Sequence, residues 1–402
     1  MTELDLTPIR EAYYSKLTQT TVDFVRDLYH EINWDSRIIG IMGSRGVGKT
    51  TLLMQRIKLR FSDDFDKALY VSLDNLWFNT NSLIDLVRHL DMQGVRHLFL
   101  DEVHKYKDWV QTIKNISDMF PRMQIVYTGS SMLEIDHSKA DMSRRQTLYT
   151  LSGLSFREYL EFEGILKLPK ISFDDIIHRH VNIAMDITSK IDIFKYFDNY
   201  LRHGYYPFYK EADRDYLLRL RETVSVVIDN DVPAVERFEF ETLNKVKKVL
   251  MIIAAQVPFV PNISNLCEQI ASTRNMTLKI LYLLDKAQLL QLITQKEKSF
   301  RTLVKPEKIL LGNSNLMYAL TSNPEIGTVR ETFFANQMSQ IGYVTSPEKG
   351  DYLFNGRYLF EVGGHRKSFR QIKDISDSFL AVDDTLVGNG NRIPLWLFGF
   401  LK

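Results

Sequence analysis

The chain contains 402 residues, of which 45% are hydrophobic and 25% are charged, and its formal net charge is +1. Because a single hydrophobic core rarely organises so many residues, this length predicts several domains, and the composition is ordinary for globular protein. The near-neutral charge excludes an overall electrostatic attraction to nucleic acid or to a membrane surface, so only a local basic patch could provide one.

The sequence lacks the usual signs of secretion and of membrane insertion. Cys267 is the single cysteine, so no disulfide can form within the chain. The first five residues include two acidic ones and do not start the apolar run of a signal peptide. No apolar stretch reaches the length of a membrane-spanning helix. We therefore expect a cytoplasmic protein with no membrane partner.

The first motif is a glycine-rich segment between an expected strand and an expected helix. Residues 8–32 have helical spacing, and the apolar residues 37–42 predict a buried strand. The next residues match G-x-x-x-x-G-K-[ST] and 51–57 are again helical in spacing, which is the context of a phosphate-binding P-loop. The alternative is a glycine-rich turn that matches by chance. The expected nucleotide-binding residues are Gly43, Ser44, Arg45, Gly46, Val47, Gly48, Lys49, Thr50 and Thr51.

Each residue type in this motif suits the binding of a nucleoside triphosphate. Glycine lets the backbone approach an anion closely, because a Cβ would block the approach. The N–H groups of the loop and of the following helix then point at the phosphates. Lys49 adds a positive charge over the phosphates, which gives it a catalytic role as well. The Thr50 hydroxyl is placed to hold Mg²⁺.

An acidic pair follows the third expected strand. After a strand at 68–73 and a helix at about 82–90, the apolar residues 97–100 lead into Asp101 and Glu102, which is the Walker B pattern. At the edge of the sheet where ligands bind, Asp101 would hold the Mg²⁺ shell. Glu102 would polarise the attacking water as a general base. The alternative is a pair of ordinary surface carboxylates, but the spacing of roughly fifty residues from the P-loop favours the functional interpretation.

Two further catalytic groups are expected after the fourth strand, at 123–128. Its polar tip offers Thr128, Ser130 and Ser131 as contacts to the γ-phosphate or the water, and we assign Ser130. The alternative is a plain Gly-Ser turn. We assign Arg145, which follows Arg144 in a polar loop, to stabilise transition-state charge. It could act within one subunit or across a homo-oligomer, and the alternative is a solvated pair.

Four segments together resemble the AAA-type ATPases that carry a DUF4143 C-terminal region. They are the P-loop, residues 100–102, residues 128–131, and the Leu-Ser-Phe-Arg-Glu-Tyr run at 154–159. The resemblance implies ATP as the nucleotide and an α/β fold with a parallel P-loop sheet. It also implies a helical lid, a winged helix and a small α+β nuclease-like terminal domain. One departure is that the family usually has Gly-Arg where this chain has Arg144-Arg145. The implied domains are 1–160, 161–237, 238–321 and 322–402.

The winged-helix segment has two interpretations. Helices are expected at 242–255, 263–270 and 276–289, followed by strands on either side of a basic loop at 296–308. A phosphate-contacting face would favour duplex DNA as partner, but much of the helix in the recognition position is apolar, which favours protein contacts. The basic residues are Arg274, Lys279, Lys296, Lys298, Arg301, Lys305 and Lys308.

The last segment predicts a remnant or relocated nuclease site. A helix at 328–341 carries Glu331, and an Asn-Gly turn joins two strands that carry Asp351 and Glu361. In PD-(D/E)xK nucleases such carboxylates bind Mg²⁺ and a lysine two residues after the second one stabilises charge. This chain has Gly363 at that position, so either Lys367 has replaced the lysine or the site is inactive. The apolar residues 393–400 predict a buried final strand.

The sequence therefore predicts an ATPase whose C-terminal domains engage duplex DNA. The alternative is a regulatory nucleotide switch in which those domains bind a protein partner. A third hypothesis, which the glycine at position 363 disfavours, is an ATP-gated, Mg²⁺-dependent nuclease.

Overall fold

The computed structural model describes residues 4–130, 142, 144–236, 238–256, 261–295 and 305–402. The chain forms two compact units. The first comprises Met1–Ser152 together with a returning segment, Asp231–Arg237, and the second comprises Gly153–Asn230 and Phe238–Lys402. The four-part division expected from the sequence remains a prediction.

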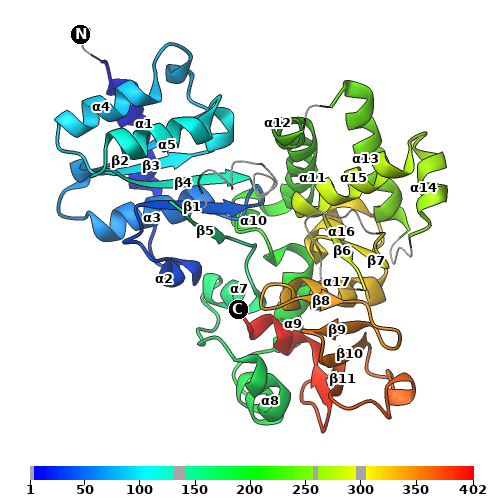
Figure 1. Cartoon of the computed structure of the whole chain (residues 1–402). Helices are drawn as coiled ribbons and strands as arrows, with labels where there is room; N and C mark the ends of the chain where they lie inside the picture. Colours follow the sequence, from blue (N-terminus) through cyan, green and yellow to red (C-terminus); the bar gives the residue numbers. More distant parts are fainter. Residues whose placement is uncertain (1–3, 131–141, 143, 237, 257–260, 296–304) are drawn as a thin grey trace. The chain divides into compact units, whose positions relative to one another are not determined.

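A five-stranded sheet forms the centre of the first unit, with strand order β2-β3-β4-β1-β5 (Figure 1). All neighbouring strands pair in parallel, which confirms the predicted α/β fold with a P-loop sheet. Strands β1, β3 and β4 are buried almost throughout, as expected for a parallel sheet covered by helices. The strands are β1 (Ile38–Gly43), β2 (Ala68–Ser72), β3 (His97–Asp101), β4 (Gln124–Ser130) and β5 (Thr147–Thr150).

The helices of the first unit bury apolar stripes against this sheet. In α4, Ser82 caps the first turn through a hydrogen bond from the Ile84 N–H, and the buried leucines follow helical spacing. The prediction of a single helix over 8–32 is wrong. The first helix ends where the backbone becomes extended at Thr20, and a second, short helix starts at Leu28. The helices are α1 (Thr7–Gln19), α2 (Leu28–Glu31), α3 (Lys49–Arg60), α4 (Leu83–Met92), α5 (Trp109–Met119) and, in the returning segment, α12 (Val232–Val235).

The second unit begins with helices and continues into a short hairpin. Ser155 and Glu158 form a capping box that starts α7. The three helices expected at 242–289 are present as α13 to α15, and β6 pairs antiparallel with β7 after them. These elements are α7 (Phe156–Phe162), α8 (Phe173–Thr188), α9 (Ile193–Asn199), α10 (Tyr209–Ala212), α11 (Tyr216–Val226), α13 (Phe240–Ala255), α14 (Ile263–Gln269), α15 (Arg274–Lys286), β6 (Leu290–Ile293) and β7 (Lys308–Leu311).

A second five-stranded sheet, of order β12-β11-β10-β9-β8, completes this unit. Helix α17 packs against β10, and the predicted Asn-Gly hairpin joins β9 to β10. The final strand predicted over 393–400 is wrong: only a short strand forms, and a 3₁₀ helix spans Leu395–Phe400. A fully buried apolar run fits either structure, so periodicity could not separate them. The elements are α16 (Ser314–Leu320), α17 (Ile326–Met338), β8 (Val344–Thr345), β9 (Tyr352–Phe354), β10 (Tyr358–Gly363), β11 (Ser378–Val382) and β12 (Arg392–Pro394).

Among the described residues, no helix has both the length and the apolar character needed to cross a bilayer.

Candidate functional site

The P-loop connects the end of β1 to the start of α3. Gly46 and Gly48 have φ values of 85° and 96°, a left-handed backbone that other residues rarely adopt. A Cβ on Gly43 would lie 2.3 Å from the Leu151 carbonyl oxygen, so this position also requires glycine. The loop and the N-terminus of α3 therefore have the backbone geometry that P-loops use to bind phosphate groups.

Lys49 is held inside this loop. Lys49 is 6% exposed, and its ammonium group donates hydrogen bonds to the carbonyl oxygens of Gly43 (2.9 Å) and Ser44 (3.0 Å). Burial lowers the pKa of Lys49, while the nearby charges of Glu102 and Asp101 oppose that shift. The arrangement places a cation beside the anion-binding backbone, where it can neutralise phosphate charge.

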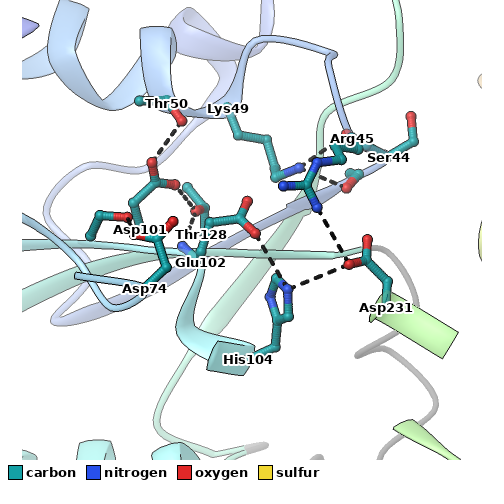
Figure 2. A network of polar contacts seen from close by, with 12 residues as sticks. Ser44, Arg45, Lys49, Thr50, Asp74, Asp101, Glu102, His104, Thr128 and Asp231 are labelled. Atoms are coloured by element: carbon teal, nitrogen blue, oxygen red, sulfur yellow. Dashed lines mark hydrogen bonds and ion pairs between the residues drawn. The ribbon is translucent and has the colours of Figure 1, made fainter. Parts of the chain in front are cut away.

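Asp101 lies at the end of β3, in the interior of the sheet, and is 3% exposed. Three hydroxyl groups donate hydrogen bonds to its carboxylate: Thr50 (2.6 Å), Tyr70 (2.7 Å) and Thr128 (Figure 2). The carboxylate of Asp101 raises the pKa of Tyr70, in addition to the larger effect of burial. The neighbouring strands β2 and β4 thus fix the orientation of this aspartate.

The residues around Asp101 fit Mg²⁺. The Thr50 hydroxyl and the Asp101 carboxylate are adjacent oxygen donors, which Mg²⁺ prefers. Within the described residues, no group of three or more His, Cys, Asp or Glu side chains could form an all-protein metal site. In nucleotide enzymes, substrate phosphates and waters usually supply the remaining Mg²⁺ ligands.

Glu102 adopts an unusual backbone conformation. Its φ is 54°, in the left-handed region, and its N–H donates a hydrogen bond to the Thr128 hydroxyl (3.1 Å). A non-glycine residue held there costs about 1–3 kcal/mol, which neighbouring contacts must offset. The side chain is 21% exposed and its carboxylate approaches His104. Strain of this kind is common at catalytic positions, which agrees with the interpretation of Glu102 as a general-base candidate.

The structure brings Thr128, rather than Ser130, to the acidic pair. The Thr128 hydroxyl bridges Asp101 and the Glu102 backbone, and its residue is fully buried. Ser130 is the last residue of β4, is 7% exposed, and lies opposite Gly43 in the strand register. Ser131 lies outside the described residues. Ser130 therefore borders the start of the P-loop, whereas Thr128 contacts the acidic pair, and the predicted role of Ser130 stays a prediction.

Arg145 forms an ion pair with Asp118 at the C-terminal end of α5. Its side chain is 37% exposed. In the part of the chain that the structure describes, no contact joins Arg145 to Asp101 or Glu102. The predicted role of Arg145 as a charge-stabilising arginine remains a prediction.

Two residues of the site were not expected from the sequence, His104 and Asp231. The His104 imidazole is 2% exposed and lies between the carboxylates of Glu102 and Asp231, and Arg45 approaches Asp231 from the P-loop (3.6 Å) (Figure 2). His104 could have been suspected, because it lies two residues beyond Glu102. Asp231 had no such signal, since it enters from the returning segment far along the chain.

In the second unit, the structure brings together three of the four residues of the predicted nuclease-like site. The Lys367 ammonium lies 2.7 Å from a Glu361 oxygen and 3.4 Å from an Asp351 oxygen. Burial would lower the pKa of Lys367, but hydrogen bonds and charge from Glu361 and Asp351 outweigh it and raise that pKa. A Cβ on Gly363 would meet the Lys367 side chain at 2.8 Å, so Lys367 fills the space beside the predicted lysine position.

Glu331 is engaged by other partners. Its carboxylate accepts hydrogen bonds from the Lys308 ammonium (2.5 Å) and from the Tyr352 hydroxyl (2.8 Å). Lys308 was one of the basic residues expected to contact phosphate, and here it forms an ion pair within the protein. Of that basic set, Lys296, Lys298 and Arg301 lie outside the described residues.

A family model matches the part of the chain that surrounds the P-loop. Residues 35–160 match the AAA domain. The matched segment starts just before β1 and ends within α7, so it contains the whole P-loop sheet and every described site residue of the first unit except Asp231.

A relative and several solved structures are also similar to this chain. A Methanocaldococcus jannaschii protein described as "Uncharacterized protein MJ1637" is 26% identical over 417 residues, covering 93% of this chain and 86% of the relative. AMPPCP-bound DnaA from Aquifex aeolicus is 17% identical, with a TM-score of 0.26. The match covers 69% of this chain and 87% of the DnaA chain. The Hsp104–ADP complex of S. cerevisiae is 13% identical over 68% of this chain and 41% of its own, with a TM-score of 0.32.

Proposed function

We propose that this protein binds ATP with Mg²⁺ and hydrolyses it. The observation that carries the proposal is the position of the Walker B pair next to the P-loop. The Thr50 hydroxyl lies 2.6 Å from Asp101, and the Thr128 hydroxyl joins Asp101 to the backbone of Glu102. The AAA domain match over 35–160 supports the same activity.

The proposed roles follow from these contacts. The loop backbone and Lys49 bind the β- and γ-phosphates and neutralise their charge. Thr50 and Asp101 would hold Mg²⁺, which adds positive charge at the phosphates when it is bound. Glu102 accepts a proton from the attacking water as general base. Ser130 at the end of β4 completes the proposed catalytic set.

Arg145 is proposed as a charge-stabilising arginine that would have to leave its ion pair with Asp118. An exposed ion pair of this kind is worth only about 0–1 kcal/mol, so breaking it costs little. Supplying the arginine to the site of a second copy would require a homo-oligomer.

We further propose that the second unit couples the nucleotide state to duplex DNA. Helices α13 to α15 followed by the β6–β7 hairpin have the element order of a winged helix. Arg274 and Lys305 are exposed, as a phosphate-contacting residue must be. The α15 face with Ile280, Leu281 and Leu284 is buried and leaves less of this helix for a groove, which favours the alternative of a protein partner.

The test is phosphate release by the wild type and by Glu102→Gln, each with and without duplex DNA at low and high salt. We expect turnover in the wild type, a loss of about 10²–10⁴-fold in Glu102→Gln with ATP still bound, and wild-type turnover in Glu211→Gln, an exposed control. DNA stimulation that weakens steeply with salt supports the DNA proposal. Turnover that ignores DNA supports the protein-partner alternative. Equal phosphate release by wild type and Glu102→Gln would show that the general-base assignment is wrong.

A second candidate activity, metal-dependent cleavage of DNA, is favoured by the meeting of Asp351, Glu361 and Lys367. Glu361 is 1% exposed, and among the described residues one of its oxygens has no hydrogen-bond partner, which leaves a ligand position for a cation. Gly363, at the position where the family commonly has lysine, disfavours the activity. Plasmid DNA incubated with Mg²⁺ and ATP tests it, and an active site predicts cleavage that Asp351→Ala and Glu361→Ala both abolish. Uncut plasmid would mean that the three residues form a structural ion pair.

A further inference from the structure

The His104 imidazole lies between two carboxylates without completing a hydrogen bond to either one. Its Nε2 is 3.3 Å from the Glu102 Oε2 and 3.7 Å from the Asp231 Oδ1, and among the residues that the structure describes neither ring nitrogen has a hydrogen-bond partner. Figure 2 shows the ring with Glu102 on one side and Asp231 on the other. The side chains of His104 and Asp231 are 2% and 4% exposed, so water has little access to either.

Asp231 connects this ring to the P-loop. Its Oδ1 lies 3.6 Å from the Arg45 guanidinium, and the same oxygen faces His104. Burial would raise the pKa of Asp231, but His104 and Arg45 outweigh that effect and lower it, which keeps the carboxylate charged. Asp231 is also the first residue of the returning segment Asp231–Arg237, and the residues on both sides of that segment belong to the second unit.

We propose that His104 is a positioning residue for Glu102, and that Asp231 competes with Glu102 for the same imidazole nitrogen. This inference rests on the proposed ATPase function. A ring nitrogen carries at most one hydrogen, so a well-aligned bond to Glu102 excludes an equally good bond to Asp231. A small shift of the segment Asp231–Arg237 therefore decides which of the two carboxylates accepts the hydrogen bond from His104.

Positioning matters here because a hydrogen bond from Thr128 fixes only the backbone of Glu102. Its backbone is held in the left-handed region, while its carboxylate is approached by His104 (3.3 Å) and interacts with the charge of Lys49. A general base must lie within hydrogen-bond reach of the water that it deprotonates. If the Glu102 carboxylate rotated freely, kcat would fall while the affinity for nucleotide stayed the same. The segment that carries Asp231 thereby gives the second unit, to which it is covalently joined, a route to control turnover.

The test compares His104→Leu with His104→Gln, each in the wild type and in Glu102→Gln, at saturating ATP. Leucine fills space without donating a hydrogen bond, whereas glutamine keeps an N–H donor. We expect His104→Leu to lower kcat by about 10- to 100-fold, the range for loss of an orienting partner, with the Kd for nucleotide unchanged. His104→Gln should recover most of kcat. The double variant Glu102→Gln/His104→Leu should have a rate within about threefold of that of Glu102→Gln alone. The effects of substituting two residues that act as a unit are not additive, so His104→Leu has little left to remove once Glu102 is replaced.

A merely structural role for His104 would give a different result. His104→Leu would then lower the residual rate of Glu102→Gln by the same factor as in the wild type, or glutamine would fail to recover kcat, and either outcome overturns the inference. The matched control is His180→Leu, which replaces another buried histidine, in α8, and should leave kcat unchanged.

Asp231→Ala tests the competition, because alanine removes the oxygen that faces His104, whereas asparagine would keep a hydrogen-bond acceptor there. Loss of this acceptor should raise kcat by a few fold, because His104 can then bond only to Glu102. A kcat at or below the wild-type value would overturn the competing role. Failure of the parent proposal is distinguishable. A wild type that releases no phosphate refutes the ATPase and this inference together, whereas an active wild type matched by an equally active His104→Leu refutes only the inference.

Discussion

Replacing Thr128 by valine tests whether one hydroxyl organises the Walker B pair. The Thr128 hydroxyl donates to the Asp101 carboxylate and accepts the Glu102 N–H at 3.1 Å, and the residue is fully buried. Valine has almost the same shape, so the substitution removes both hydrogen bonds and leaves no cavity. It is therefore a clean measurement of what these two contacts contribute to stability.

The expected loss follows from the groups left without a partner. A hydrogen bond to a charged group contributes about 1.5–3 kcal/mol, and an unsatisfied buried N–H costs about 1–3 kcal/mol. Asp101 keeps hydrogen bonds from the Thr50 and Tyr70 hydroxyls, so only part of the stabilisation from the charged hydrogen bond is lost. We therefore expect Thr128→Val to lower the free energy of unfolding of the first unit by about 2–4 kcal/mol. Turnover should fall as well, because the left-handed backbone of Glu102 loses its hydrogen-bond acceptor.

Urea unfolding followed by tryptophan fluorescence measures this change. The tryptophans Trp34, Trp77 and Trp109 all lie in the first unit, so the fluorescence signal mainly follows that unit. The control is Thr21→Val, which makes the same substitution at an exposed threonine of the first unit and is therefore reported by the same tryptophans. The control should change stability by less than about 0.5 kcal/mol. If Thr128→Val cost no more than Thr21→Val, the two Thr128 hydrogen bonds would not be present in solution.

Two further predictions concern the two lysines. Lys49→Met should weaken ATP binding by at least about 100-fold, as seen by titration with a fluorescent nucleotide, because the charge over the phosphates is lost. Its thermal midpoint should hardly fall, since burial already disfavours the charged form; a large fall would contradict this. Lys367 has its pKa raised above the ordinary 10.5, so its ion pairs stabilise fully below about pH 10.5 and less as pH rises through the folded pKa. The wild type should therefore lose more urea stability than Lys367→Met between pH 9 and pH 11.5, and equal losses would refute the ion-pair interpretation.

The sequence by itself determined the P-loop sheet and the residues of the P-loop. These residues are contiguous, and their chemistry is written in residue types that tolerate few substitutes: glycine at Gly46 and Gly48 for positive φ, and lysine at Lys49 for charge. Asp101 and Glu102 were predictable for a related reason. They end a buried strand, and parallel strands bring their carboxyl ends to one edge of the sheet whatever their order.

Tertiary structure decided which hydroxyl serves the acidic pair and what lies next to Glu102. Thr128 and Ser130 are two residues apart on the same strand, so the sequence alone could not choose between them. The register of β4 against β3 and β1 brings Thr128 to Asp101 and places Ser130 beside Gly43. Asp231 meets Arg45 only because the chain returns to the first unit after a long excursion.

The position of the Lys367 side chain was likewise a matter of three-dimensional packing. The sequence left two possibilities open, a relocated lysine or an inactive site, because four residues of loop can place a long side chain in many directions. In the structure the Lys367 ammonium lies beside Asp351 and Glu361, and its role as the relocated lysine stays a prediction. Local chemistry is encoded where neighbours in sequence act together; contacts between distant segments depend on how the whole chain packs, and that was visible only in the folded structure.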